Sequence, residues 1–155
     1  MRKYTVNKSL ATSATAATNT MPIGIQGSAT KGIQVYDLYC SFNAVVQDIQ
    51  VLVGLSLCST YVAGTAFTAN PLEIGDVASS ATATTTLTVG SQVLTGTPLW
   101  EQAFNTRGSI RMVVPDPDSR IILPAGANAA GSIILYNQQA STIACTLDNQ
   151  IYFAE

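Results

Sequence analysis

Apolar and polar residues alternate over much of the chain, and the clearest case is the segment 47–60, QDIQVLVGLSLCST. Large apolar residues recur there at every second position: Ile49, Val51, Val53, Leu55 and Leu57. Because successive side chains of a β-strand point to opposite faces, this spacing places all five on one face of a strand. Gly54 lies on the other face and indicates a bulge or a close approach to the backbone.

The last segment, 141–155, alternates in the same way. One face receives Ile143, Cys145, Leu147, Ile151 and Phe153, and the other receives Thr142, Thr146, Asp148 and Gln150. Segment 108–114 predicts a further strand, with Ile110, Met112 and Val114 facing inward and Arg111 outward. Both segments therefore predict strands with one buried face.

Other segments rich in β-branched and aromatic residues predict strands at 32–42, 81–89, 119–126 and 129–139. Residues 61–80 predict a long connection, and PLWEQAFN (98–105) predicts a loop or a single helical turn. No sustained helical period is present. About eight short strands separated by Gly, Pro and Asn predict an all-β fold, an antiparallel β-sandwich or jelly roll.

The first 30 residues are rich in Ser, Thr, Ala and Asn, and TSATAATNT has too little apolar bulk for a core. Within this segment Ile23 and Ile25 lie on one side of a predicted short strand. We expect residues 1–30 to form an extended N-terminal arm on the surface or on a neighbour, and residues 31–155 to form the sandwich domain.

Charged residues make up only 10% of the chain, against about 25% in an average protein. A net charge of −2 gives little repulsion between copies, which favours assembly. The seven basic residues form no run, so we expect no nucleic-acid partner. Three of them, Arg2, Lys3 and Lys8, are predicted to lie in a solvent-exposed N-terminal tail. Apolar stretches are too short for a signal peptide or a membrane span, so we also expect no membrane partner.

The absence of histidine excludes Ser–His and Cys–His nucleophile systems and histidine-based metal sites. Cys40, Cys58 and Cys145 have no zinc-site spacing and each lies in an apolar segment, so we expect buried, reduced thiols in a reducing cytoplasm. No phosphate-binding glycine motif is present. We therefore expect no cofactor and no metal.

Asp116 and Asp118, in PDPDS, are the most conspicuous pair of acids. Proline fixes φ and cannot donate to a sheet, while Asp and Ser favour turns, so the segment predicts a connection between two strands. The alternative is a Ca²⁺ site, which would need further ligands such as Asp76 or Glu73. A pair of glycosidase carboxylates is a third interpretation, and nothing in the sequence marks two acids for it.

Trp100, Phe104 and Tyr61 have two interpretations: they plug the end of the sandwich, or they form a stacking platform for sugars. Arg107 and Arg111 are predicted to pair with Glu101 or Asp76 or to lie in solvent, with contact to a neighbouring subunit as the alternative.

Two longer stretches, AGTAFTANPLEIGDVASSAT (63–82) and LWEQAFNTRGSIRMVVPDPDSRIILPAGANAAGSIILYN (99–137), together with the final YFAE, resemble small virion proteins of tailed phages. The shared elements are Gly-Thr followed by Pro-Leu, the Phe-Asn-x-Arg element (Phe104, Asn105, Arg107), and Leu-Pro-Ala-Gly before an Ala/Asn/Gly turn. The family that these stretches resemble is that of the capsid decoration, or cement, proteins.

This resemblance implies a jelly-roll domain that forms a homotrimer on the outer surface of the head and binds the major capsid protein. It also implies an N-terminal arm that grips the shell, synthesis in the host cytoplasm, and a structural protein rather than an enzyme. The competing interpretation is a carbohydrate-binding module of a head fibre or tail, with Trp100 and Tyr61 as stacking residues. A hydrolase would need clustered acids and a cleft.

Overall fold

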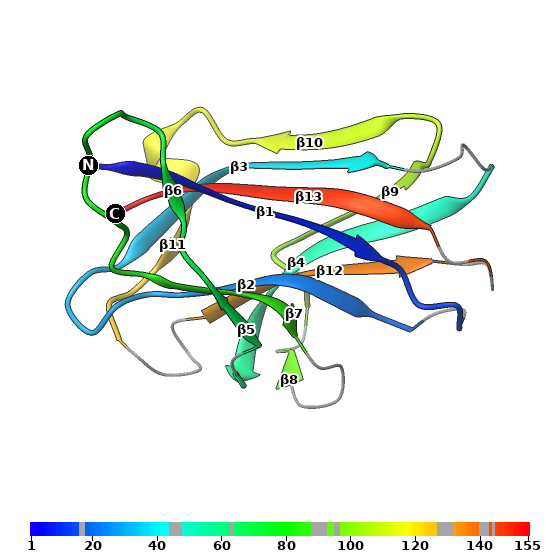
Figure 1. Cartoon of the computed structure of the whole chain (residues 1–155), viewed down its shortest axis with the longest axis horizontal. Coiled ribbons are helices and arrows are strands. Elements are labelled where there is room, and N and C mark those ends of the chain that lie inside the picture. The colour runs from blue at the N-terminus through cyan, green and yellow to red at the C-terminus, as the bar shows by residue number, and fades with distance from the viewer. Residues whose placement is uncertain are drawn as a thin grey trace.

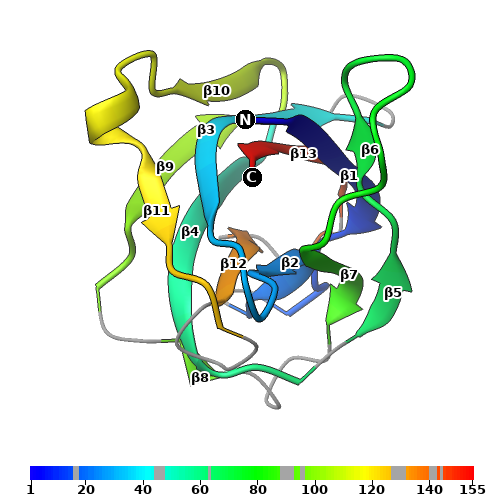
Figure 2. The ribbon, with the colours of Figure 1, turned by 90° about the vertical axis from the view of Figure 1, so that its left-hand side faces the viewer.

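The computed structural model describes residues 1–15, 18–43, 48–62, 64–87, 93–94, 97–126, 132–139, 143 and 145–155. These residues form two antiparallel sheets that face each other as a β-sandwich (Figures 1 and 2). The first sheet, sheet A, contains β10 (Ser109–Val113), β3 (Ile33–Phe42), β13 (Thr146–Ala154), β1 (Lys3–Ala11) and β6 (Asn70–Pro71), in that order, with β11 (Ile121–Leu123) also paired to β3.

The second sheet, sheet B, runs in the order β5 (Thr65–Phe67), β7 (Thr82–Leu87), β2 (Thr20–Gln26), β12 (Ser132–Gln139), β4 (Gln50–Thr60) and β8 (Val93–Leu94), with β9 (Trp100–Asn105) also paired to β4. The chain crosses between the sheets after β1, β2 and β3, again after β5 and β6, and finally after β9, β11 and β12. A short 3₁₀ turn, η1 (Pro117–Ser119), joins β10 to β11.

The main core lies between the sheets and follows from the predicted alternation. Val51, Val53 and Leu55 of β4 are fully buried there, and Leu147, Ile151 and Phe153 reach the same core from β13. The inward faces of β4 and β13 are therefore confirmed. Ile143 is the exception, because its side chain is 52% exposed. In β10, Ile110 is also buried and Met112 packs against the core, as predicted, whereas Val114 is only half-buried.

A second, smaller apolar cluster lies on the opposite face of sheet B, since Ile134 and Tyr136 alternate with the core residues Ile133 and Leu135. The ring of Tyr136 lies over Gly54, its partner in the β12–β4 ladder. A Cβ at Gly54 would lie 2.2 Å from Tyr136 Cζ. Of the two predicted roles of Gly54, the close approach is therefore confirmed.

Buried polar groups cross the core near one end of the sandwich. Asn149 of β13 is fully buried, and its Oδ1 accepts from Asn137 of β12 at 3.0 Å and from the Cys40 thiol at 3.3 Å. Thr12 donates to Gln139 at 2.6 Å and accepts from the backbone N–H of Cys145 at 3.0 Å. Buried polar groups require such partners, and these bonds link the two sheets at a defined register.

Four expectations are wrong. The described residues form thirteen strands, not about eight. The segment 98–105 is mostly the edge strand β9, whose backbone pairs with β4, and the connection 61–80 contains β5 and β6. Residues 3–11 and 20–26 are not a surface arm: β1 lies between β13 and β6, and β2 lies between β12 and β7. Tyr4 and Val6 are fully buried, which supplies the apolar area that the composition did not suggest.

Candidate functional site

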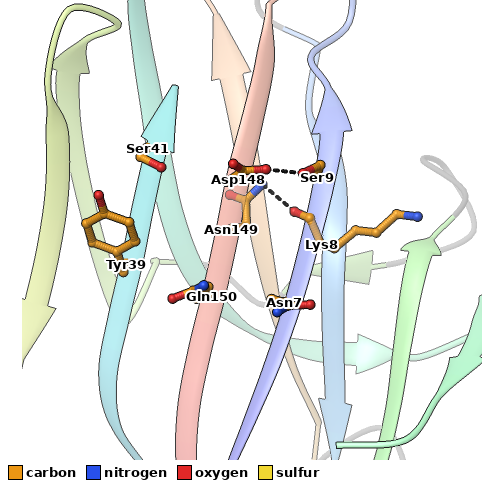
Figure 3. Close-up of a pocket in the computed structure, with 8 residues that line it drawn as sticks. All are labelled: Asn7, Lys8, Ser9, Tyr39, Ser41, Asp148, Asn149 and Gln150. Carbon is orange, nitrogen blue, oxygen red and sulfur yellow. Dashed lines mark hydrogen bonds between the residues drawn. The ribbon is translucent and has the colours of Figure 1, made fainter. Parts of the chain in front are cut away.

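The outer face of sheet A carries a ladder of polar side chains. The antiparallel register places Ser9 of β1, Asp148 of β13 and Ser41 of β3 side by side. The next outward row is formed by Asn7, Gln150 and Tyr39. Figure 3 shows these side chains on three neighbouring strands. Because the strands hold them at fixed spacings, hydroxyl, amide, carboxylate and phenol groups form one ordered surface.

A pocket of about 300 Å³ lies on this face, lined by Asn7, Lys8, Ser9, Tyr39, Ser41, Asp148, Asn149 and Gln150. Asp148 Oδ1 accepts a short hydrogen bond from the Ser9 hydroxyl and another from Asn43 Nδ2 at 3.0 Å. Tyr152, one row further along β13, donates to Gln150 Oε1 at 2.9 Å. The carboxylate of Asp148 and the amide of Gln150 are therefore held in place by their neighbours.

Beyond the pocket the same face carries aromatic and ionic contacts. Arg111 Nε donates to both carboxylate oxygens of Asp37, at 3.0 and 3.2 Å. The rings of Tyr36 and Tyr152 lie 6.4 Å apart, and the Arg120 guanidinium lies 5.4 Å from the centre of the Tyr36 ring. This geometry is that of a cation–π contact, and it extends the ordered surface towards β11.

The loop between β6 and β7 carries apolar side chains out into solvent at the end of the sandwich where both chain ends lie (Figure 1). Leu72 is 44% exposed, Val77 54% and Ile74 fully exposed. Gly75 has a φ of 93°, a backbone conformation that favours glycine, and it turns the chain directly after Ile74. Neighbouring exposed apolar residues on one loop indicate an interaction surface. We call Leu72, Ile74 and Val77 the apolar loop.

The apolar loop is fastened to the sandwich on both sides of its tip. Leu72 N–H donates to the carbonyl of Lys3 at 2.9 Å, and the Tyr4 hydroxyl donates to the carbonyl of Val77 at 3.2 Å. Arg2 Nε lies 3.2 Å from Asp76 Oδ1. These contacts tie the loop to β1 and hold the apolar side chains outward.

Glu155 fastens the end of the same loop. Its carboxylate accepts from the backbone N–H and the hydroxyl of Ser80, both at 2.9 Å, and from Ala81 N–H at 3.3 Å. Burial alone would raise the pKa of Glu155, but the hydrogen bonds from Ser80, with Lys31 nearby, outweigh it and lower the pKa. The loop is therefore anchored by a carboxylate that stays ionised.

A second exposed apolar group follows the edge of the sandwich formed by β9, β10 and β11 (Figure 2). Val113 is 52% exposed, Ile122 59% and Leu99, just before β9, 42%. β10 and β11 end sheet A on this side. A sheet edge with unpaired backbone groups and apolar side chains favours pairing with another chain. We call Leu99, Val113 and Ile122 the apolar edge.

The structure places Asp116 and Asp118 at a turn, as predicted. Asp116 caps η1: its Oδ1 accepts from Asp118 N–H and its Oδ2 from the Ser119 hydroxyl, each at 3.1 Å. Glu73 and Asp76 lie beside the opposite edge of sheet A, with β3, β13 and β1 between. Strands are spaced about 4.8 Å apart, so the predicted calcium ligands are not brought together. Among the described residues, no group of three or more Cys, Asp or Glu is placed to hold a metal.

Trp100 and Phe104 are half-buried and pack against the main core from β9, so they close the side of the sandwich rather than its end. Tyr61 lies elsewhere, over Gly24 in the second cluster, and its hydroxyl forms a short hydrogen bond with Thr84. The three aromatic residues therefore do not form one platform, and Trp100 and Tyr61 are not brought together as stacking residues.

The predicted ion pairs are also different. Arg107 Nε lies 3.8 Å from Asp48 Oδ1 and Arg111 binds Asp37, whereas Asp76 pairs with Arg2. Glu101 accepts a short hydrogen bond from the Tyr136 hydroxyl. The three cysteines are buried and free, as predicted, and burial raises the pKa of Cys40 to about 12.

Sequence reasoning placed Asp148 and Gln150 on the outward face of the last strand but did not place Tyr39 and Asn7 beside them. The polar residues at alternate positions of β1 and β3 are visible in the sequence. They indicate a common site only when the order of the strands in the sheet is known. In the described part of the chain there is no helix with the length and hydropathy of a membrane span.

No family model matches the chain, and no curated protein matches it. Among solved structures, the chain is similar to one described as the infectious bursal disease virus VP2 subviral particle, at 11% sequence identity and a TM-score of 0.25. That alignment covers 98% of this chain and 41% of the other, so the chain spans less than half the length of that protein. A TM-score this low does not establish a shared fold, and the two-sheet sandwich rests on this chain's own strands.

Proposed function

We propose that the chain is a structural protein of a phage virion that binds the outer surface of the capsid and stabilises the assembled shell. Its partner is the major capsid protein, it acts as a homotrimer, and it has no catalytic role. The observation that carries the proposal is the apolar loop, in which Ile74 is fully exposed while the flanking residues are fastened by Tyr4, Arg2 and Glu155. An apolar tip on a fixed base is suited to docking because little entropy is lost on binding.

The strand order supports the proposal. Eight strands form the two four-stranded runs β1-β13-β3-β10 and β2-β12-β4-β9, and the chain passes between them as in a jelly roll. Jelly rolls occur in viral capsid and lectin domains. The remaining strands belong to the connections, chiefly the long one after β4. The resemblance of residues 63–82 and 99–137 to phage decoration proteins points the same way.

The apolar edge is the surface that we assign to contact between copies. Pairing there covers the free backbone groups of β10 and β11 together with Val113 and Ile122. In a closed ring, the apolar edge of each copy contacts a different surface of the next copy. This arrangement leaves the apolar loop of every copy free to bind the shell. Several apolar loops that bind one shell at the same time give avidity, although each single contact is weak. Because the protein binds the assembled lattice more tightly than free capsid subunits, its binding stabilises the assembled shell.

The test compares two substitutions at one position, Ile74→Asn and Ile74→Val. Burying an isoleucine side chain contributes about 1.5–3 kcal/mol, so Ile74→Asn should weaken each contact by about tenfold or more, whereas Ile74→Val keeps most of the apolar area. The assay is co-sedimentation with heads purified from phage that lack the protein. Equal binding of the two variants, or no binding by the wild type, contradicts the proposal.

A further inference from the structure

We propose that the pocket on the outer face of sheet A binds a neutral saccharide. Neither the resemblance nor the proposed shell contact assigns a ligand to this site. The pocket has the composition of a sugar site: adjacent hydroxyl, amide and carboxylate groups beside one aromatic ring. Its volume of about 300 Å³ is at the lower end of the range for ligand pockets, which suits one or two sugar rings rather than a long chain.

The polar groups are arranged to bind pairs of neighbouring hydroxyls. In the described part of the chain, both side-chain hydrogen bonds to Asp148 end on Oδ1, which leaves Oδ2 for a ligand. Asn7 and Gln150 are paired across β1 and β13, and each amide offers donors and an acceptor about one strand spacing apart. The Tyr152 hydroxyl donates to Gln150 Oε1, so the Gln150 amide nitrogen is directed away from Tyr152 and remains a donor for the ligand.

Tyr39 supplies the apolar surface that a sugar ring needs. It lies beside Gln150 on β3, half-buried, with its ring next to the polar row (Figure 3). The faces of aromatic rings bind apolar C–H surfaces, and a tyrosine adds a hydroxyl at the rim. The Tyr39 ring and the hydrogen-bonding groups beside it can therefore orient a bound sugar although the pocket is shallow.

The charges of the pocket favour a neutral ligand. Figure 3 shows the Lys8 side chain running away from the other residues, and the Lys8 carbonyl accepts from Asn149 at 3.4 Å. Asp148 is then the charged group that faces the pocket among its lining residues. A carboxylate repels phosphate and acidic sugars but accepts strong hydrogen bonds from hydroxyls. A single carboxylate also falls short of the six to eight oxygen ligands that Ca²⁺ takes.

The site and the apolar loop can be occupied together. The loop is fastened at Lys3 and Tyr4, whereas the pocket begins at Asn7 and reaches Ser9 on the same strand. A strand rises about 3.3 Å per residue, so Lys3 and Ser9 are about 20 Å apart. A protein held on a shell through its loop would leave the pocket accessible, and many copies would turn a weak site into a useful one.

The test is an NMR titration of the intact protein with glucose, galactose, mannose and N-acetylglucosamine, each added separately. We expect at least one of them to shift the side-chain amide signals of Asn7 and Gln150, with a Kd of about 1 mM. Asp148→Asn keeps the size and the contacts with Ser9 and Asn43, and it should weaken binding by about tenfold. Gln102→Ala, on β9 in the other sheet, is the control and should leave the Kd unchanged.

Two results would overturn the saccharide site. The first is an absence of shifts with all four sugars up to about 100 mM, well above the expected Kd. The second is an equal response of the same amides to inorganic phosphate, which would identify an anion site instead. Because neither measurement involves heads, a negative result here leaves the shell-binding proposal standing, and loss of shell binding by Ile74→Asn leaves the saccharide site standing.

Discussion

The contact between Tyr136 and Gly54 gives the sharpest test of the packing on the outer face of sheet B. A methyl group at Gly54 would lie 2.2 Å from Tyr136 Cζ and 2.6 Å from Cε1, well inside van der Waals contact. In Gly54→Ala the ring must move, which costs about 1–3 kcal/mol, typical of overpacking. Moving the ring also breaks the hydrogen bond from its hydroxyl to Glu101, worth about 1 kcal/mol. The expected loss in the free energy of unfolding is therefore about 2–4 kcal/mol.

Urea denaturation of the wild type and Gly54→Ala measures this loss. Gly108→Ala is the matched control, because the nearest atom to its added methyl group, the Asn105 carbonyl oxygen, is 3.8 Å away, and it should change stability by less than about 0.5 kcal/mol. In a Tyr136→Ala background, Gly54→Ala should cost less than about 1 kcal/mol, since the ring is gone. Equal stability of the two glycine variants would refute the reasoning.

Three further predictions concern titration and assembly. Burial raises the pKa of the Cys40 thiol from 9.0 to about 12. The contribution of the neutral thiol to the free energy of unfolding is therefore complete below pH 9 and falls by about 1.4 kcal/mol per pH unit between pH 9 and 12. Cys40→Ala should lessen this alkaline loss of stability in urea denaturation. The pKa of Glu155 is lowered below its usual value of 4.5 in the folded protein. The contribution of its carboxylate to the free energy of unfolding is therefore complete above pH 4.5 and is lost as the pH falls through the folded-state pKa. Glu155→Gln should remove this dependence of stability on acid pH. Ile122→Lys should convert the proposed trimer, with a mass of three times 16.2 kDa, into a monomer by light scattering, and an unchanged mass would contradict the assigned interface.

The elements predicted from sequence were those whose pattern is strictly local. In β4 and β13 every second residue is apolar, and the sandwich buries one face of each, so alternation alone was sufficient. β9 was missed because its Trp100 and Phe104 are four residues apart and it lies at an edge with only partial burial. That spacing fits a helical turn equally well, and only the pairing with β4 decides between them.

Contacts between distant residues could not be predicted. Residues 3–11 join sheet A because β13 and β6 pair with β1 on either side. The composition of residues 1–30 gives no indication of either partner strand. The apolar loop was read as an ordinary connection, since its anchors come from Tyr4 and Glu155, at opposite ends of the sequence. The saccharide pocket likewise needs three strands that are adjacent in space but not in sequence.

The measurement that tests the central claim most directly is the copy number of this chain per purified virion, determined by quantitative mass spectrometry against the major capsid protein. A protein that covers the shell through its apolar loop should be present on the order of hundreds of copies, in a fixed ratio to the capsid protein set by the lattice symmetry. Tens of copies or fewer would place the chain on a fibre or tail, and its absence from virions would contradict the structural role altogether.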